Sequence, residues 1–126
     1  MENTDFILLR QTTLRIYLAT GQGIPGLTFW QRLWRNNLAN FILKKAKESG
    51  IRQAIMFPVR AGFLTDTKLV FATTEIVPPR LPVCIEVTGE PQQLASFIRL
   101  NDDLLKNTFM VLENPDTYQI VYQSNQ

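Results

Sequence analysis

The segment VCIEVTG, residues 83–89, constrains the fold of this chain more than any other stretch. It is a mostly apolar run set off by prolines at 78, 79 and 82, and this pattern predicts a central β-strand. Pro91 follows it at a position that suits the first turn of a helix. Apolar side chains then recur at helical spacing, at Leu94, Phe97, Ile98, Leu104 and Leu105. We therefore expect a buried strand followed by an amphipathic helix.

Two further segments predict strands in the first half of the chain. TTLRIYLAT, residues 12–20, alternates apolar and polar residues, which is typical of a strand with one buried face. GQGIPG, residues 21–26, breaks the pattern and predicts a flexible loop. RQAIMFPVR, residues 52–60, is a second strand, and Pro58 favours its end or a sheet edge.

A long helix is expected between these strands. Thr28 and Gln31 have the spacing of a capping box, and apolar residues recur at helical spacing from there to Gly50. A continuous helix would have about 21 residues and a length on the order of 30 Å. Asn36 and Asn37 are weak helix formers, which leaves open a break in the middle.

The remaining segments complete the order of elements. KLVFATTEI, residues 68–76, is a further strand or an extended loop arm, and residues 108–113 and 118–123 form a strand with a turn at 114–116. The order is strand, helix, strand, long loop or hairpin, strand, helix, strand. This order is that of the ferredoxin-like βαββαβ sandwich, an α+β fold with two helices on one face of an antiparallel sheet.

The length of the chain predicts the number of domains, and the face of the sheet that carries no helix predicts how copies of the chain assemble. With 126 residues the chain is expected to be one domain, with residues 1–11 as an N-terminal extension. Residues 64–80 form the long loop or β-arm between the second and third core strands. The second face of the sheet has apolar residues and no helix to cover it, so we expect a homo-oligomer, specifically a trimer.

Composition argues against several functions. The net charge of +2 is too small to indicate a nucleic-acid partner. The chain has no histidine, and its one cysteine, Cys84, lies in an apolar run, so neither a metal site nor a nucleophile is expected. The acidic residues are scattered, and GQGIPG lacks the spacing of a phosphate-binding loop. We therefore expect no catalytic residues and no enzyme.

The N-terminal residues and the apolar runs bear on location. MENTDFILLRQ has acidic residues before a short apolar run and no small-residue cleavage site, unlike a signal peptide. No apolar stretch approaches the roughly 18 residues needed to cross a bilayer. The expectation is a cytoplasmic protein without membrane insertion.

Four phrases resemble a known family: LRIYL (14–18), LKKAKESGI (43–51), Ala-Gly-Phe (61–63) and LPVCIEVTGEPQQLASFI (81–98). They resemble the P-II-like signalling proteins, and among these a small conserved family of unknown function. The resemblance implies a homotrimer whose clefts between subunits bind an adenine nucleotide (ATP, ADP or AMP), with no required cofactor. It also implies that the loop after the second strand acts on a partner protein, such as a transporter or an enzyme.

The resemblance implies a ligand site made of Arg60, Ala61, Gly62 and Phe63 at the loop base, Glu86 on a strand, and Lys106 and Asn107 after the second helix. Arg60 and Lys106 would supply positive charge to a phosphate, and Gly62 would permit its close approach. In a second interpretation, Gly62 only permits a turn and Arg60 lies in solvent. Glu86 either bonds the ligand or, as we favour, pairs with a cation across a subunit interface.

Trp30 and Trp34 are four residues apart and share a helix face. They either anchor a partner, cover the neighbouring subunit or pack within their own chain. Two hypotheses follow for the whole protein. It is a regulatory binding protein that senses a nucleotide and acts through residues 61–80, or a structural or interaction trimer of the same fold that binds no nucleotide.

Overall fold

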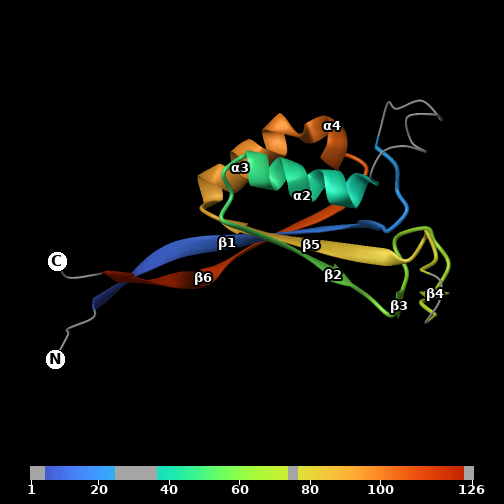
Figure 1. The fold of residues 1–126 in the computed structure, drawn as a ribbon, viewed down its shortest axis with the longest axis horizontal. Coiled ribbons are helices and arrows are strands. Elements are labelled where there is room, and N and C mark those ends of the chain that lie inside the picture. The colour runs from blue at the N-terminus through green and yellow to red at the C-terminus, as the bar shows by residue number, and fades with distance from the viewer. Residues whose placement is uncertain (1–4, 25–36, 74–76, 124–126) are drawn as a thin grey trace.

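The computed structural model describes residues 5–24, 37–73 and 77–123. Its centre is an antiparallel sheet in the order β2-β5-β1-β6. The strands are β1 (Asp5–Ala19), β2 (Gln53–Pro58), β5 (Pro82–Gly89) and β6 (Phe109–Gln123). The helices are α2 (Leu38–Glu48), α3 (Pro91–Leu100) and the short α4 (Asp102–Leu105). The helices lie on one face of the sheet (Figure 1), which confirms the predicted ferredoxin-like α+β fold.

The hydrophobic core lies between the sheet and the helices. Its side chains include Leu14, Ile16 and Leu18 from β1, Val83, Ile85 and Val87 from β5, and Leu38, Ile42, Ala46, Leu94 and Phe97 from the helices. Successive strand residues point to opposite faces, so every second side chain of β1 and β5 points toward the helices. The alternation in the sequence therefore determines which face of each strand is buried.

The second face of the sheet, here called the open face, carries the other side chains of the strands. The register aligns Ile55, Glu86, Arg15 and Val111 in one row across the sheet, and Phe57, Cys84, Tyr17 and Phe109 in the next. None of the described helices covers this face (Figure 1). Ile55, Phe57 and Phe109 are 41%, 44% and 59% exposed, so the open face is the uncovered apolar surface that the sequence predicts.

Helix α2 occupies the second half of the helix that the sequence predicts. Asn37 has extended backbone (φ −67°, ψ 171°), and its side-chain oxygen accepts a hydrogen bond from the Asn40 N–H at 3.0 Å. It is therefore an N-cap, and its side-chain amide also donates to the Thr20 carbonyl at 2.7 Å. Of the two alternatives that the sequence left open, the break is therefore the one observed, at Asn37. The preceding part, with Trp30 and Trp34, lies outside the described residues.

A small antiparallel hairpin, residues 60–72, follows β2. Strand β3 (Ala61–Gly62) pairs with β4 (Val70–Phe71). Between them, the Thr67 hydroxyl accepts from the Leu64 N–H and donates to the Leu64 carbonyl, both at 2.8 Å. This part of the predicted loop or arm is thus a hydrogen-bonded β-arm, although β4 is shorter than the strand expected over 68–76.

Beyond the sheet, β1 and β6 continue as a two-stranded ribbon, residues 5–11 and 117–123, which projects at the left of Figure 1. The predicted N-terminal extension is therefore largely strand. The predicted turn at 114–116 is wrong, because β6 is continuous and its register passes from Thr13↔Glu113 to Gln11↔Thr117. The inserted residues form a bulge-like irregularity, where a proline such as Pro115 is tolerated.

Candidate ligand-binding groove

A groove, here called the hairpin groove, lies between the hairpin, the end of β1 and the start of β6. It consists of two adjoining hollows of about 430 and 410 Å³, which share Tyr17, Leu64, Thr65 and Phe109. Each hollow alone falls within the size range of small-molecule sites. The groove is therefore large enough for a ligand of nucleotide size.

Strand register forms the aromatic part of this groove. Tyr17 projects away from the core because its neighbours Ile16 and Leu18 point toward the helices. Phe109, the first residue of β6, lies directly opposite Tyr17, and the two ring centroids are 6.2 Å apart. This distance is typical of an aromatic pair and offers an apolar surface to a planar ligand.

The connection after α4 forms the polar end of the groove. Lys106, Asn107 and Thr108 line it. The backbone N–H groups of Lys106 and Thr108 already donate within the preceding turn, at 2.9 and 3.0 Å. The Gln22 side chain donates to the Asn107 carbonyl at 3.2 Å and so holds the connection against the end of β1. Among the described residues that line the groove, Lys106 is the one with a positively charged side chain.

Two titratable groups beside the groove are neutral at ordinary pH. Tyr17 and Cys84 are neighbours across β1 and β5. Burial raises the pKa of the Cys84 thiol, and it raises the pKa of the Tyr17 hydroxyl with a further contribution from Cys84. The hydroxyl is therefore a hydrogen-bond donor or acceptor here, and neither group is prepared as a base or a nucleophile.

The structure brings part of the predicted ligand site together. Phe63, Lys106 and Asn107 line the hairpin groove. Ala61 and Gly62 lie beside it in β3 but are not among the lining residues. Arg60, at the base of the hairpin, is exposed and forms no ion pair with any described residue; its carbonyl accepts from the Ala72 N–H at 2.7 Å. The predicted residues are therefore divided between the groove and the hairpin base.

Glu86 lies on the open face and not among the groove residues. Its carboxylate is 3.5 Å from Nε of Arg15, its neighbour across β1 and β5, and Arg15 also pairs with Glu113. The sequence led us to favour a cation of another subunit, whereas the partner observed here belongs to the same chain. Tyr17, Leu64, Thr65 and Phe109 were not predicted as groove residues, although the alternation in β1 does place Tyr17 on the uncovered face.

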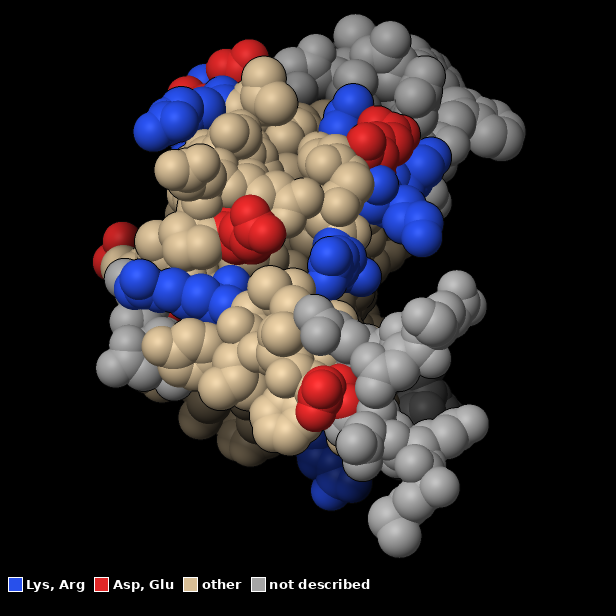
Figure 2. Space-filling view, turned by 90° about the vertical axis from the view of Figure 1, so that its left-hand side faces the viewer, with Lys and Arg blue, Asp and Glu red and all other residues tan. Residues whose placement is uncertain are grey.

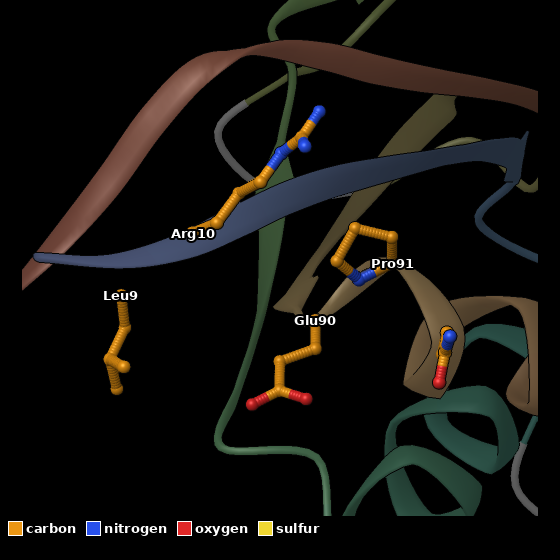
Figure 3. A pocket seen from close by; sticks show the side chains of 5 residues that line it. Leu9, Arg10, Glu90 and Pro91 are labelled. Atoms are coloured by element: carbon orange, nitrogen blue, oxygen red, sulfur yellow. The ribbon is translucent and has the colours of Figure 1, made fainter.

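A second cavity of about 350 Å³ lies where the ribbon meets the start of α3 (Figure 3). Leu9, Arg10, Glu90, Pro91 and Gln92 line it. In Figure 3 the Leu9 and Glu90 side chains lie on one side of β1, whereas Arg10 extends to the other side. None of the predicted ligand residues is in this cavity. Within the described ranges, no cluster of potential metal ligands was found, and no helix is long and apolar enough to cross a membrane.

Comparisons with known proteins agree with this architecture. Residues 11–116 match the family DUF190, described as Uncharacterized ACR, COG1993. A UPF0166 protein of Aquifex aeolicus is 30% identical over 83 residues, which cover 66% of this chain and 85% of that protein. The family match extends over most of the sheet and its helices.

Solved structures share the fold at low sequence identity. CPII, a nitrogen regulatory PII-like protein of Thiomonas intermedia, was solved with ADP, AMP and bicarbonate; it has a TM-score of 0.52 and 6% identity, covering 99% of this chain and 94% of that one. A second CPII structure, with ADP and bicarbonate, has a TM-score of 0.51 at 6% identity, covering 99% and 95%. A candidate PII-like signaling protein of Thermus thermophilus gives 0.50 at 11%, covering 93% and 92%. The chain therefore belongs to the uncharacterised conserved family DUF190 and has the ferredoxin-like fold of the P-II-like proteins.

Proposed function

We propose that this protein is a P-II-like regulatory protein that binds an adenine nucleotide in the hairpin groove. In this proposal three copies form a ring, and each groove is completed at an inter-subunit cleft. The protein acts on a partner protein, a transporter or an enzyme, through residues 61–80, and it is not an enzyme. It works in the cytoplasm and requires no further cofactor.

The observation that carries this proposal is the composition of the groove. Its walls include residues of two segments that the resemblance to the P-II-like proteins implies for a nucleotide site, the hairpin and the connection after α4. Phe109 and Tyr17 provide an apolar surface on which a base can stack, and Lys106 provides a positive charge for a phosphate. The nucleotides bound to CPII, a protein with the same fold, support the same ligand class.

The hairpin supports a role in partner binding. Phe63, Leu69 and Phe71 are 67%, 58% and 64% exposed. Large apolar side chains gathered on one projecting element are typical of a protein contact. Because Phe63 also lines the groove, a ligand there would contact the same hairpin that presents this surface.

A structural trimer that binds no nucleotide is the second candidate. It is favoured by the backbone N–H groups of Lys106 and Thr108, which are already used within the chain. It is also favoured by the position of Arg60 outside the groove lining. If a nucleotide does bind, its phosphate would therefore depend on the Lys106 ammonium and on groups of a neighbouring subunit.

Isothermal titration with ATP, ADP and AMP separates the two candidates. The proposed function requires a dissociation constant near or below about 100 μM, which corresponds to about 5.5 kcal/mol. Lys106→Ala should weaken binding about tenfold or more, since hydrogen bonds to charged groups contribute about 1.5–3 kcal/mol. Lys47→Ala, an exposed position on α2 outside the groove, is the matched control and should leave the affinity unchanged. Absence of heat with all three nucleotides would reject the nucleotide site and leave the structural trimer.

A further inference from the structure

Several polar side chains of the hairpin groove are already bonded within the chain. The Thr67 hydroxyl is engaged with both backbone groups of Leu64. The Thr108 hydroxyl donates to a carbonyl of the preceding turn at 2.6 Å. The Gln22 amide is used at both ends, since its nitrogen donates to the Asn107 carbonyl at 3.2 Å and its oxygen accepts from an N–H of β1 at 3.3 Å. These groups contribute to the shape of the groove more than to the binding of a charged ligand.

Lys106 and Asn107 form a pair of donors at the polar end of the groove. Both are exposed, and the Lys106 ammonium forms no ion pair with any described residue. An ammonium and a side-chain amide both donate to phosphate oxygens. Phe109 is three residues after Lys106, so their Cα atoms are at most about 11 Å apart. The stacking surface and the cation are therefore held close together, as the two ends of a small nucleotide require.

Further charge is sparse in the groove. Among its described lining residues Lys106 is the one cation, and there is no carboxylate. The other cations of the hairpin, Arg60 and Lys68, do not line either hollow. Mg²⁺ beside a nucleotide is commonly held by one or two carboxylates together with phosphate oxygens. The described lining thus offers a longer phosphate chain neither a second cation nor a carboxylate ligand for Mg²⁺.

The opposite end of the molecule shows a different distribution of charge. The hairpin lies at the right of Figure 1, and Figure 2 views the other end, from which the ribbon projects. On the described surface of that end, Lys and Arg side chains are spread out with Asp and Glu among them (Figure 2). A phosphate chain therefore meets no single positive patch there that would compete with the groove.

We propose that the hairpin groove discriminates by the number of phosphates and binds a nucleoside monophosphate in preference to the di- and triphosphate. A phosphate monoester carries about −1.5 to −2 charges at neutral pH, which the ammonium and the adjacent amide match in part. Each further phosphate adds negative charge that has no cation among the described lining residues. Moving unpaired charge from water into a partly apolar groove is unfavourable. The inference rests on the proposed function, because it requires an adenine nucleotide in the groove.

Isothermal titration of the wild type with adenosine, AMP, ADP and ATP, with and without Mg²⁺, measures the preference. AMP should bind about tenfold or more tightly than adenosine, since hydrogen bonds to charged groups are the strong ones. ADP and ATP should bind no more tightly than AMP under either condition. ADP or ATP binding more than about threefold tighter than AMP would show a further cation at the groove and overturn the proposal. AMP binding no tighter than adenosine would overturn it too.

Substitutions of Lys106 test whether its charge makes the difference. Lys106→Ala should remove the difference between the AMP and adenosine affinities, whereas Lys106→Arg should keep most of it because the charge is retained. Lys106 is exposed, so neither substitution disturbs the core. A difference that survives in Lys106→Ala would assign the phosphate to another group and contradict the proposal.

A second cation added to the groove tests the count of charges. Thr65 is exposed and lines both hollows. Thr65→Lys should raise the affinity for ATP relative to AMP about three- to fivefold, since an exposed ion pair contributes little more than this. Ser96→Lys adds the same charge at an exposed position of α3 outside the groove, and it is the matched control that should leave the ratio unchanged. An unchanged ratio in Thr65→Lys would count against the proposal.

The same titrations separate this inference from the proposed function. Absence of heat with adenosine and with all three nucleotides rejects the groove as a nucleotide site, and the preference with it. Binding of all three nucleotides with ATP tightest keeps the proposed function and rejects only the preference for one phosphate.

Discussion

Replacing Gly21 by alanine should detach the segment that returns from the hairpin region to β5. Gly21 follows β1, and its N–H donates to the Pro79 carbonyl at 2.8 Å. A Cβ added to Gly21 would stand 2.6 Å from Cβ and 3.0 Å from Cα of Pro79. A proline ring cannot rotate out of the way, so the backbone at Pro79 has to move. The neighbouring bond from the Thr20 N–H to the Leu81 carbonyl, also 2.8 Å, would weaken with it.

The size of the effect follows from these contacts. Each of the two backbone hydrogen bonds contributes about 1 kcal/mol. Displacing Leu81, which is 3% exposed, adds some loss of apolar burial, while alanine lowers the entropy of the unfolded chain and offsets about 0.5 kcal/mol. The net loss is about 2 kcal/mol in the free energy of unfolding. At about 4 °C for each kcal/mol, Tm should fall by about 8 °C.

Thermal unfolding followed by circular dichroism, at one fixed protein concentration, measures this loss. Gly62→Ala is the matched control, because a Cβ there would meet Cγ of Pro82 at 3.5 Å, an ordinary contact. It should change the free energy of unfolding by less than about 0.5 kcal/mol. The steric argument would be refuted if Gly21→Ala were as stable as the wild type, or if Gly62→Ala were equally destabilised.

Three further predictions concern the core, a helix cap and the thiol. Phe97→Ala should lower the free energy of unfolding, measured by urea denaturation, by about 3–5 kcal/mol, because Phe97 is 1% exposed. Leu100→Ala, at an 81% exposed position, should lower it by less than about 0.5 kcal/mol. Asn37→Ala should lower the free energy of unfolding by about 1–2 kcal/mol, because it removes the cap of α2. Asn37→Asp keeps the cap acceptor but loses the donor to the Thr20 carbonyl, so it should recover only part of this loss; equal stability of all three proteins would contradict the cap. Burial raises the pKa of Cys84 above its ordinary 9.0, so iodoacetamide should react with it at pH 8 at least about tenfold more slowly than with the urea-unfolded chain; equal rates would contradict the burial. The same shift makes the folded thiol ionise later than the unfolded one, so any contribution to stability is lost as the pH rises above about 9.

The core could be predicted from the sequence because it depends on local periodicity. Leu14, Ile16 and Leu18 alternate with polar residues, and this alternation alone determines which side of β1 faces the helices. Pro91 marked the start of α3 for an equally local reason, since a proline suits the first turn. The order of such elements then left the ferredoxin-like fold as the arrangement with one sheet and two covering helices.

The groove and the ribbon depend on register between distant segments, which periodicity does not provide. Tyr17 meets Phe109 only because β1 and β6 pair with a particular alignment. The Arg15–Glu86 pair depends in the same way on β1 and β5. The Asn-Pro-Asp stretch at 114–116 has the composition of a turn, but pairing with β1 on both sides of it keeps β6 continuous.

Strand β1 contributes residues to the core, to the open face and to the ribbon, at different positions along its length. Its residues Leu14, Ile16 and Leu18 hold the core, Arg15 and Tyr17 lie on the open face, and Phe6 and Leu8 extend into the ribbon. Substitutions at Ile16 should therefore lower stability, whereas substitutions at Tyr17 should act on the groove. Ile16 and Tyr17 are adjacent but point to opposite faces of the sheet. Of these two residues, therefore, only Tyr17 can be substituted so that ligand binding is lost while stability is unchanged.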